Sequence, residues 1–169
     1  MRRYKEFMPG RRILKTAVSV FLSVQLFYFF GHTTPVHAAL ACILTLRPTE
    51  TETKERGKNR LIGTLVGGLS SYLGLILLQY LPINSQSNFA PIIIAAFVYL
   101  SLWIGKSLHL DPYAIAIASV VATVTMISHN QHHSDALSYV SLRMFETLVG
   151  FLIAYLVNKY LFKRRPEET

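Results

Sequence analysis

Long apolar runs alternate with short polar clusters along the whole chain. The runs cover approximately residues 13–30, 34–46, 61–81, 90–105, 112–128 and 143–162. A helix needs about 20 predominantly apolar residues to cross a bilayer. In lipid, every backbone polar group must also be bonded within the spanning segment. The pattern therefore predicts an all-α polytopic membrane protein of six transmembrane helices.

Composition leaves little of the chain outside these runs. Hydrophobic residues make up 51% of the sequence and charged residues 15%, whereas soluble domains carry about 25% charged residues. We expect a single integral membrane domain over residues 1–169, with short cytoplasmic tails at 1–10 and 163–169 and membrane lipids as partners. Because no room remains for a soluble catalytic domain, the sequence does not predict an enzyme.

Positive charge predicts the orientation. If the amino terminus is cytoplasmic, all but one of the 17 Lys and Arg residues fall in the tails or in the loops at 47–60 and near Lys106. The exception is Arg143. The positive-inside rule then predicts six spans with both termini in the cytoplasm. The basic residues form no surface interleaved with aromatic residues, so a nucleic-acid partner is not expected.

Two segments of the chain are nearly the same. "RLIGTLVG" and "RMFETLVG" are identical at five positions, the arginine at the start and the Thr-Leu-Val-Gly at the end, so Arg60 matches Arg143, Thr64 matches Thr147 and Gly67 matches Gly150. The preceding second spans begin at Pro35 and Pro112. Two copies of a three-helix unit, at about 11–81 and 90–162, explain this pattern, and an odd number of spans makes the second copy inverted. Inverted repeats are common in secondary transporters, with the site between the halves. Chance similarity of Leu, Val and Gly remains the alternative.

The two arginines are the first candidates for binding an anion. Each is expected near the amino terminus of its helix, where free N–H groups favour negative charge. We take Arg60, Arg143, Thr64 and Thr147 as substrate-binding candidates. Arg60 has an alternative role as the last cytoplasmic anchor of its loop. Glu146 lies one turn after Arg143 and can pair with it, either in function or to hold the helix against a neighbour.

The second span is unusually short. Pro35 to Leu46 makes about 18 Å of helix, against a hydrocarbon core of about 30 Å. The segment is either extended at its ends or is a half-helix, which would indicate a nearby binding site. His37 lies in its first turn, and we take His37 and Glu146 as candidate proton-coupling groups. A hydrogen-bonded interfacial histidine is the alternative.

The small residues point to close helix packing. Gly63, Gly67 and Gly150 have the spacing that lets helix backbones approach each other. Cys42, the only cysteine, lies in an apolar run and is read as a small packing residue. The residues before it, "PVHA" and "LAC", imitate the end of a secretory signal, but the apolar run continues and four more spans follow.

Metal chemistry has one candidate. "HNQHH" places His129, His132 and His133 close together, a composition that suggests metal. Only Asp135 could join them, so a polar loop is the default reading. We expect no metal and no cofactor.

Longer motifs resemble a known family. "GRRILKTAVSV", the Pro-started helix with "AA", "NRLIGTLVG" and "LRMFETLVGFLIAYLVNKYLF" resemble the aromatic acid exporter family, within the broader fusaric acid resistance group. The matching positions in the last span are Arg143, Phe145, Gly150 and Asn158. The resemblance covers about residues 8–165.

The resemblance implies a six-helix inner-membrane module that exports small aromatic or organic acids. Many family members continue where this chain ends, soon after Arg165. The resemblance therefore implies a homo-oligomer that builds the pathway. A non-transporting scaffold or accessory subunit of a cell-envelope complex is the alternative function. A membrane enzyme is a third, supported only by the histidine loop.

Overall fold

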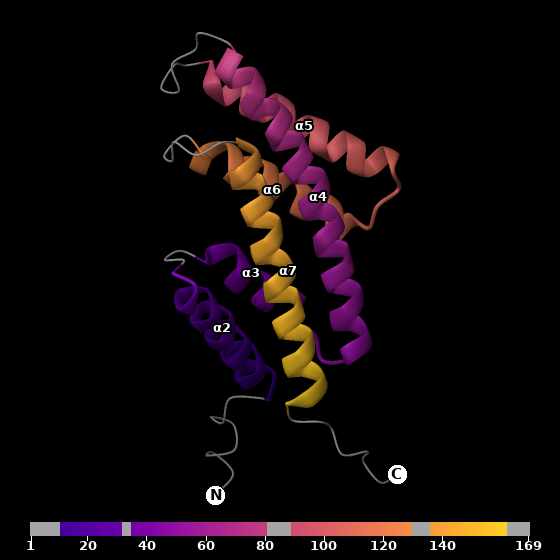
Figure 1. Ribbon diagram of the computed structural model, residues 1–169. Helices are drawn as coiled ribbons and strands as arrows, with labels where there is room; N and C mark the ends of the chain where they lie inside the picture. Colours follow the sequence, from indigo (N-terminus) through magenta and orange to yellow (C-terminus); the bar gives the residue numbers. More distant parts are fainter. Residues whose placement is uncertain (1–10, 32–34, 81–88, 130–135, 162–169) are drawn as a thin grey trace, which may run out of the picture. The chain divides into compact units, whose positions relative to one another are not determined.

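The computed structural model describes residues 11–31, 35–80, 89–129 and 136–161, and these residues are helical throughout except for turns. The helices are α2 (Arg11–Phe29), α3 (Val36–Thr45), α4 (Glu50–Tyr80), α5 (Ala90–Ser107), α6 (Pro112–His129) and α7 (Ala136–Tyr160) (Figure 1). The all-α prediction is confirmed. Four of the six apolar runs match a helix to within two residues at both ends, whereas α4 and α7 begin well before the runs that predicted them.

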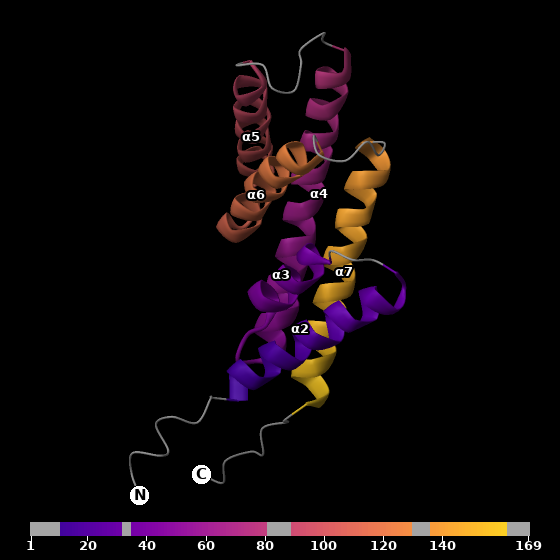
Figure 2. The ribbon, with the colours of Figure 1, turned by 90° about the vertical axis from the view of Figure 1, so that its left-hand side faces the viewer.

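The chain folds as two compact units. Unit 1 consists of residues 1–57 and 146–169, and unit 2 consists of residues 58–145. The long helices α4 and α7 each contribute one part to each unit. Unit 1 also contains α2 and α3, which pack against each other, and unit 2 contains the packed pair α5 and α6. Figures 1 and 2 show α5 and α6 adjacent and joined by the short turn at 108–111.

The start of α4 differs from the sequence prediction. Residues 50–60 were expected in a loop, but α4 begins at Glu50. The hydroxyl oxygen of Thr49 accepts a hydrogen bond from the N–H of Glu52 at 3.2 Å, which caps the helix. Glu50 and Glu52 also place negative charge in the first turn, where the helix dipole favours it.

This start changes the position of both arginines. Arg60 lies about three turns inside α4, and α7 begins at Ala136, so Arg143 lies about two turns inside α7. The prediction that each arginine lies near a helix amino terminus is therefore wrong. The free N–H groups of a first turn do not assist these side chains.

Among the residues that the structure describes, three helices are long and apolar enough to cross a membrane, namely α4, α5 and α7. The apolar helices at 13–29, 36–45 and 112–128 are shorter. With 10 residues, α3 extends only about 15 Å. The short second span predicted from the sequence is thus found as a short helix.

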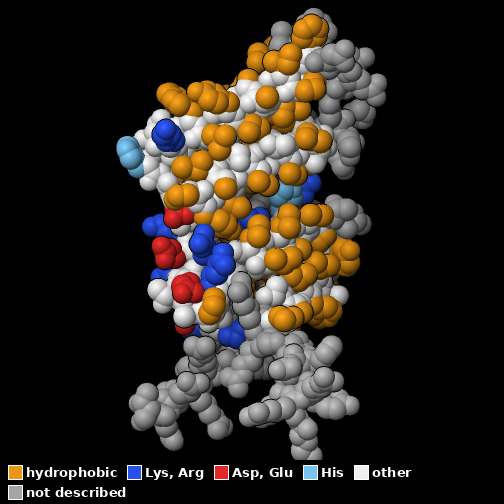
Figure 3. Space-filling model, turned by 180° about the vertical axis from the view of Figure 1, so that it is seen from behind, with side chains coloured by type: hydrophobic (Ala, Val, Ile, Leu, Met, Phe, Trp, Pro, Cys, Tyr) orange, Lys and Arg blue, Asp and Glu red, His pale blue; other side chains and the backbone are white. Residues whose placement is uncertain are grey.

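Most fully buried side chains are Ala, Ser, Thr or Cys, with a few larger ones such as Leu46 and Met126. Cys42, Leu46 and Ala154 form a buried cluster in unit 1, and Leu75, Met126 and Ala136 form one in unit 2. Many large hydrophobic side chains are exposed, and Figure 3 shows hydrophobic side chains spread over the described surface of this face, with the acidic and several basic side chains in one zone and other basic side chains apart from it. An apolar exterior around a core of small residues is the arrangement expected of helices in lipid.

Candidate functional site

In unit 2, the glycines of α4 lie against the backbone of α6. A Cβ atom added at Gly63 would meet the carbonyl of Ala114 and would lie 3.0 Å from the Cβ of Ile117. A Cβ atom added at Gly67 would meet the carbonyl of Ala118 and lie 3.0 Å from its carbon. Real Cβ atoms do not approach backbone this closely, so only glycine allows this crossing.

Gly150 of α7 makes the corresponding approach in unit 1. A Cβ atom added there would meet the carbonyl of Ala38 in α3 and lie 2.8 Å from the Cβ of Ala41. The thiol of Cys42 donates to the carbonyl of Gly150 at 3.2 Å. Cys42 is fully buried, and its small thiol fills the space beside the glycine.

Arg60 and Thr64 are both buried on α4. Arg60 is 3% exposed, and the hydroxyl of Thr64 donates to the carbonyl of Arg60 at 2.8 Å. The threonine therefore satisfies its hydroxyl within its own helix, as threonine often does. A guanidinium group this deeply buried in an apolar helix is costly, and such groups in membrane proteins usually mark a functional pathway.

Arg143 is half-buried and is positioned by a residue that sequence reasoning missed. Its Nη2 donates to the hydroxyl of Tyr139 at 2.9 Å, and its guanidinium carbon lies 4.6 Å from the centre of the same ring. Tyr139 is itself buried. The sequence signal that could have found Tyr139 is its spacing of four residues from Arg143, which places both on the same face of a helix. The expected pairing of Arg143 with Glu146 stays a prediction.

The two proton-coupling candidates both lie in unit 1. Glu146 on α7 is 2% exposed and His37 on α3 is 7% exposed, and Thr147 is buried beside Glu146 in the sequence. Ionisable groups with this little access to water are rare in the membrane and face the protein interior.

Asn158 is the centre of a hydrogen-bond cluster in unit 1. Its amide nitrogen donates to the carbonyls of Arg47 and Thr49 at 3.1 and 3.0 Å and to the hydroxyl of Thr53 at 2.7 Å. Lys15 donates to the amide oxygen of Asn158 at 2.8 Å. The cluster ties the end of α7 to α2 and to the corner between α3 and α4. The resemblance pointed to Asn158, but its partners lie too far away in sequence to be predicted.

Replacing Asn158 with alanine is expected to lower the free energy of unfolding by about 2–4 kcal/mol. The change leaves two carbonyls, a hydroxyl and an ammonium group without their amide partner, and each buried polar group left unpaired costs about 1–3 kcal/mol. Unfolding of the purified chain in mixed micelles by a denaturing detergent measures this loss. Thr51→Ala is the control, because Thr51 is exposed on nearby α4, and equal stability of the two variants would contradict the role of the cluster.

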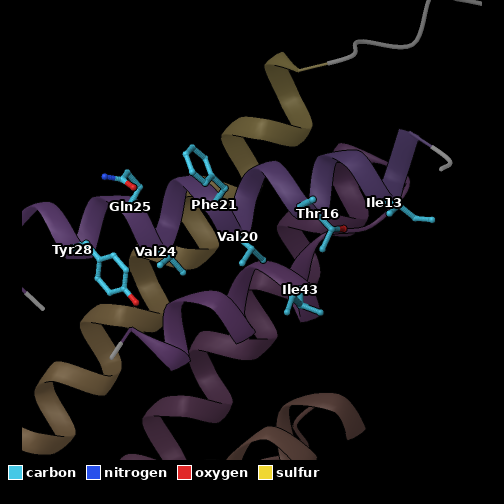
Figure 4. Close-up of a pocket in the computed structure, with 9 residues that line it drawn as sticks. Ile13, Thr16, Val20, Phe21, Val24, Gln25, Tyr28 and Ile43 are labelled. Carbon is cyan, nitrogen blue, oxygen red and sulfur yellow. The ribbon is translucent and has the colours of Figure 1, made fainter. Parts of the chain in front are cut away.

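A groove of about 920 Å³ runs along α2 in unit 1. In Figure 4, Val20, Val24 and Tyr28 of α2 lie on the side of Ile43 from α3, while Phe21 and Gln25 lie on the other side of α2. The lining is mostly apolar, but Thr16 and Gln25 add polar groups. A surface of this kind suits a lipid-facing position or a second helix, and it contains no charged residue among its described lining.

Within the residues that the structure describes, no three His, Cys, Asp or Glu side chains lie close enough to hold a metal ion. The "HNQHH" candidate lies largely outside them: His132, His133 and Asp135 are not described, and only the backbone of His129 is. The metal reading of that segment therefore stays untested.

Apolar helices with glycine-based crossings and buried polar side chains define a helical membrane protein. Residues 18–157 match the family model described as fusaric acid resistance protein-like, and the chain belongs to this family. The resemblance found in the sequence is thereby confirmed for the broader group.

Curated relatives match over nearly the whole chain. It is 27% identical over 152 residues to a UPF0421 protein of Oceanobacillus iheyensis, an alignment that covers 90% of this chain and 40% of the relative. It is 28% identical over 157 residues to a UPF0421 protein of Staphylococcus saprophyticus, covering 92% and 43%. The chain thus spans about two fifths of the length of these relatives. No solved structure matches the chain.

Proposed function

We propose that this chain is the membrane module of an exporter of small aromatic or organic acids in the bacterial inner membrane, and that it acts as a homo-oligomer. Six crossings arranged as two inverted three-helix repeats would form it, with both termini in the cytoplasm. Arg60 and Arg143 would attract the carboxylate, Thr64 and Thr147 would line the route, and Glu146 and His37 would carry the coupled proton.

The burial of Arg60 is the observation that supports this function best. Its side chain is almost inaccessible within a long apolar helix. Burying a charged side chain within the membrane is costly, and such residues usually mark a substrate or ion pathway. The family membership adds independent support, since its description refers to resistance against an aromatic carboxylic acid, fusaric acid.

Two equivalent helix crossings support the repeat. Gly67 and Gly150 hold the same place in the duplicated segment, and each lies against the carbonyl of an alanine in the second helix of the other half, Ala118 or Ala38. Chance similarity of the two segments does not by itself explain why both glycines make the same type of contact. The shared geometry therefore favours duplication over coincidence.

The crossings also give the register of the second helices. They align Ala38 with Ala118, so equivalent residues are 80 positions apart. The alignment of Pro35 with Pro112 differs from this register by three residues. In the new register the buried positions agree along both helices. The equivalent buried pairs are His37 and Ile117, Ala38 and Ala118, Ala41 and Val121, Cys42 and Ala122, Thr45 and Thr125, and Leu46 and Met126.

The exposed groove on α2 supports self-association. Gln25 carries an amide that lipid cannot hydrogen-bond, and it is exposed about two thirds of the way along an apolar helix. Glutamine side chains bond across helices in membranes, and two amides are mutually complementary as donor and acceptor. A second copy of this chain placed on the groove would satisfy both amides.

Flux measured with purified protein tests the proposal. The full chain in liposomes is expected to move benzoate or 4-hydroxybenzoate along an imposed gradient at least about tenfold faster than protein-free liposomes. Benzamide, which has nearly the same shape without the negative charge, is expected to show no protein-dependent flux. Absence of carboxylate flux under any proton or substrate gradient would overturn the exporter and leave the scaffold function.

A further inference from the structure

One of the two equivalent helix crossings has ionisable residues where the other has none. In unit 2, the crossing of α4 and α6 places Gly63 directly beside Ile117, with 3.0 Å from an added Cβ atom to the Cβ of Ile117. In unit 1, the residues at the same two positions are Glu146 and His37. The crossing in unit 1 therefore has a carboxylate and an imidazole where the crossing in unit 2 has an apolar contact.

Observed contacts determine which residues correspond. Gly150 and Ala38 meet as Gly67 and Ala118 do. Glu146 lies one turn before Gly150 on α7, and His37 immediately precedes Ala38 on α3. Both side chains are buried and both belong to unit 1. The Cβ atom of a glutamate requires a slightly wider separation than glycine does, and side chains as long as glutamate and histidine can still bridge that separation.

We propose that Glu146 and His37 form one proton-holding pair at the crossing of α3 and α7. Without the proton, the carboxylate and the neutral imidazole together carry one negative charge. Uptake of one proton on the imidazole nitrogen makes the pair neutral overall and bonds imidazolium to carboxylate. The role of this pair in coupling rests on the proposed export function, in which one proton would enter as one organic anion leaves.

The other charged side chains of unit 1 lie on or between the helices around this crossing. Lys15 of α2 is bonded to Asn158, three turns of α7 beyond Glu146. Arg56 precedes Gly57 on α4, and a Cβ atom added at Gly57 would meet the ring of Phe151, the residue after Gly150. The remaining described charged residues of this unit are Arg47, Glu50, Glu52, Lys54, Glu55 and Lys159. Along α7 itself, Arg143 precedes Glu146 by one turn.

Disulfide formation tests whether the two residues are adjacent. The only native cysteine can be removed as Cys42→Ala, and His37→Cys with Glu146→Cys is then expected to form a disulfide in high yield, because a disulfide requires Cα atoms within about 7 Å. A protease site inserted between α4 and α5 makes the bond visible as two fragments held together. His37→Cys with Leu148→Cys is the control, because Leu148 is exposed on the same helix. If both double variants formed the disulfide to the same extent, or if neither formed it, the proposed pair would be overturned.

Nuclear magnetic resonance tests whether they share a proton. The imidazole ¹⁵N signals of His37, assigned by their loss in His37→Gln, are expected to change their titration midpoint by about one unit or more in Glu146→Gln. Glu50→Gln, at the exposed start of α4, should leave the midpoint unchanged. An unchanged midpoint in Glu146→Gln would overturn the shared site. Both measurements need no substrate, so a chain without flux would lose the export function and keep the pair.

Discussion

Replacing Arg143 with alanine is expected to abolish export of aromatic carboxylates while the protein stays folded. The guanidinium group is held by the hydroxyl and the ring of Tyr139, so its charge is already oriented when an anion arrives. Removing one partner from a buried charge interaction typically costs about 2–5 kcal/mol. We therefore expect the initial rate of benzoate efflux from proteoliposomes to fall at least about 30-fold, which corresponds to the lower end of that range.

Two further variants separate charge from positioning. Arg143→Lys keeps the positive charge but loses the planar group that stacks on Tyr139, and we expect it to retain part of the flux. Tyr139→Phe removes only the hydroxyl bond and keeps the ring under the guanidinium, so a loss of about three- to tenfold is expected. A monodisperse Arg143→Ala protein with full flux would rule out Arg143 as part of the anion route.

The apolar runs predicted most helices because lipid imposes one requirement on long segments of the chain. Segments such as 90–105 and 112–128 leave no way other than a helix to bond their backbone groups in lipid. The resulting helices α5 and α6 begin and end within two residues of these runs. Where hydrophobicity alone decides the structure, the sequence pattern is a sufficient guide.

The start of α4 was missed because hydrophobicity does not decide it. Residues 50–59 are polar, but Glu, Lys and Arg are good helix formers. Thr49 followed by Glu52 is the capping-box pattern, which marks a helix start independently of hydrophobicity. Reading that pattern would have placed Arg60 inside the helix and removed the argument from free N–H groups.

Side-chain partners were the least predictable part of the candidate site. Asn158 bonds to Arg47, Thr49 and Thr53, all more than 100 positions away, and no local periodicity encodes such contacts. The register that we propose for α3 and α6 differs from the one that the prolines suggest, for a related reason. Pro35 and Pro112 report where each helix begins, whereas the crossings of Gly67 and Gly150 report which faces meet.

Replacing Gly150 with valine is expected to prevent the α3–α7 crossing from forming. The first added carbon would meet the carbonyl of Ala38 and approach the Cβ of Ala41 to 2.8 Å. Neither group can rotate away, since one is backbone and the other has no further torsion. Overpacking against flexible side chains costs about 1–3 kcal/mol, so an obstacle made of backbone should cost at least the upper end of that range. Loss of the monodisperse peak in size-exclusion chromatography and a lower free energy of unfolding in mixed micelles measure the effect.

A matched pair of glycines in unit 2 shows whether the crossings are equivalent. Gly67→Val is expected to be as damaging as Gly150→Val, because an added carbon there meets the carbonyl of Ala118 in the same way. Gly68→Ala is the control on the neighbouring position, where an added carbon meets only the side chain of Val140, at 3.1 Å. A small shift of that side chain accommodates it, so this variant should remain folded. If Gly150→Val proved as stable as Gly68→Ala, the close backbone approach would not hold α3 against α7, and the register that brings His37 beside Glu146 would lose its basis.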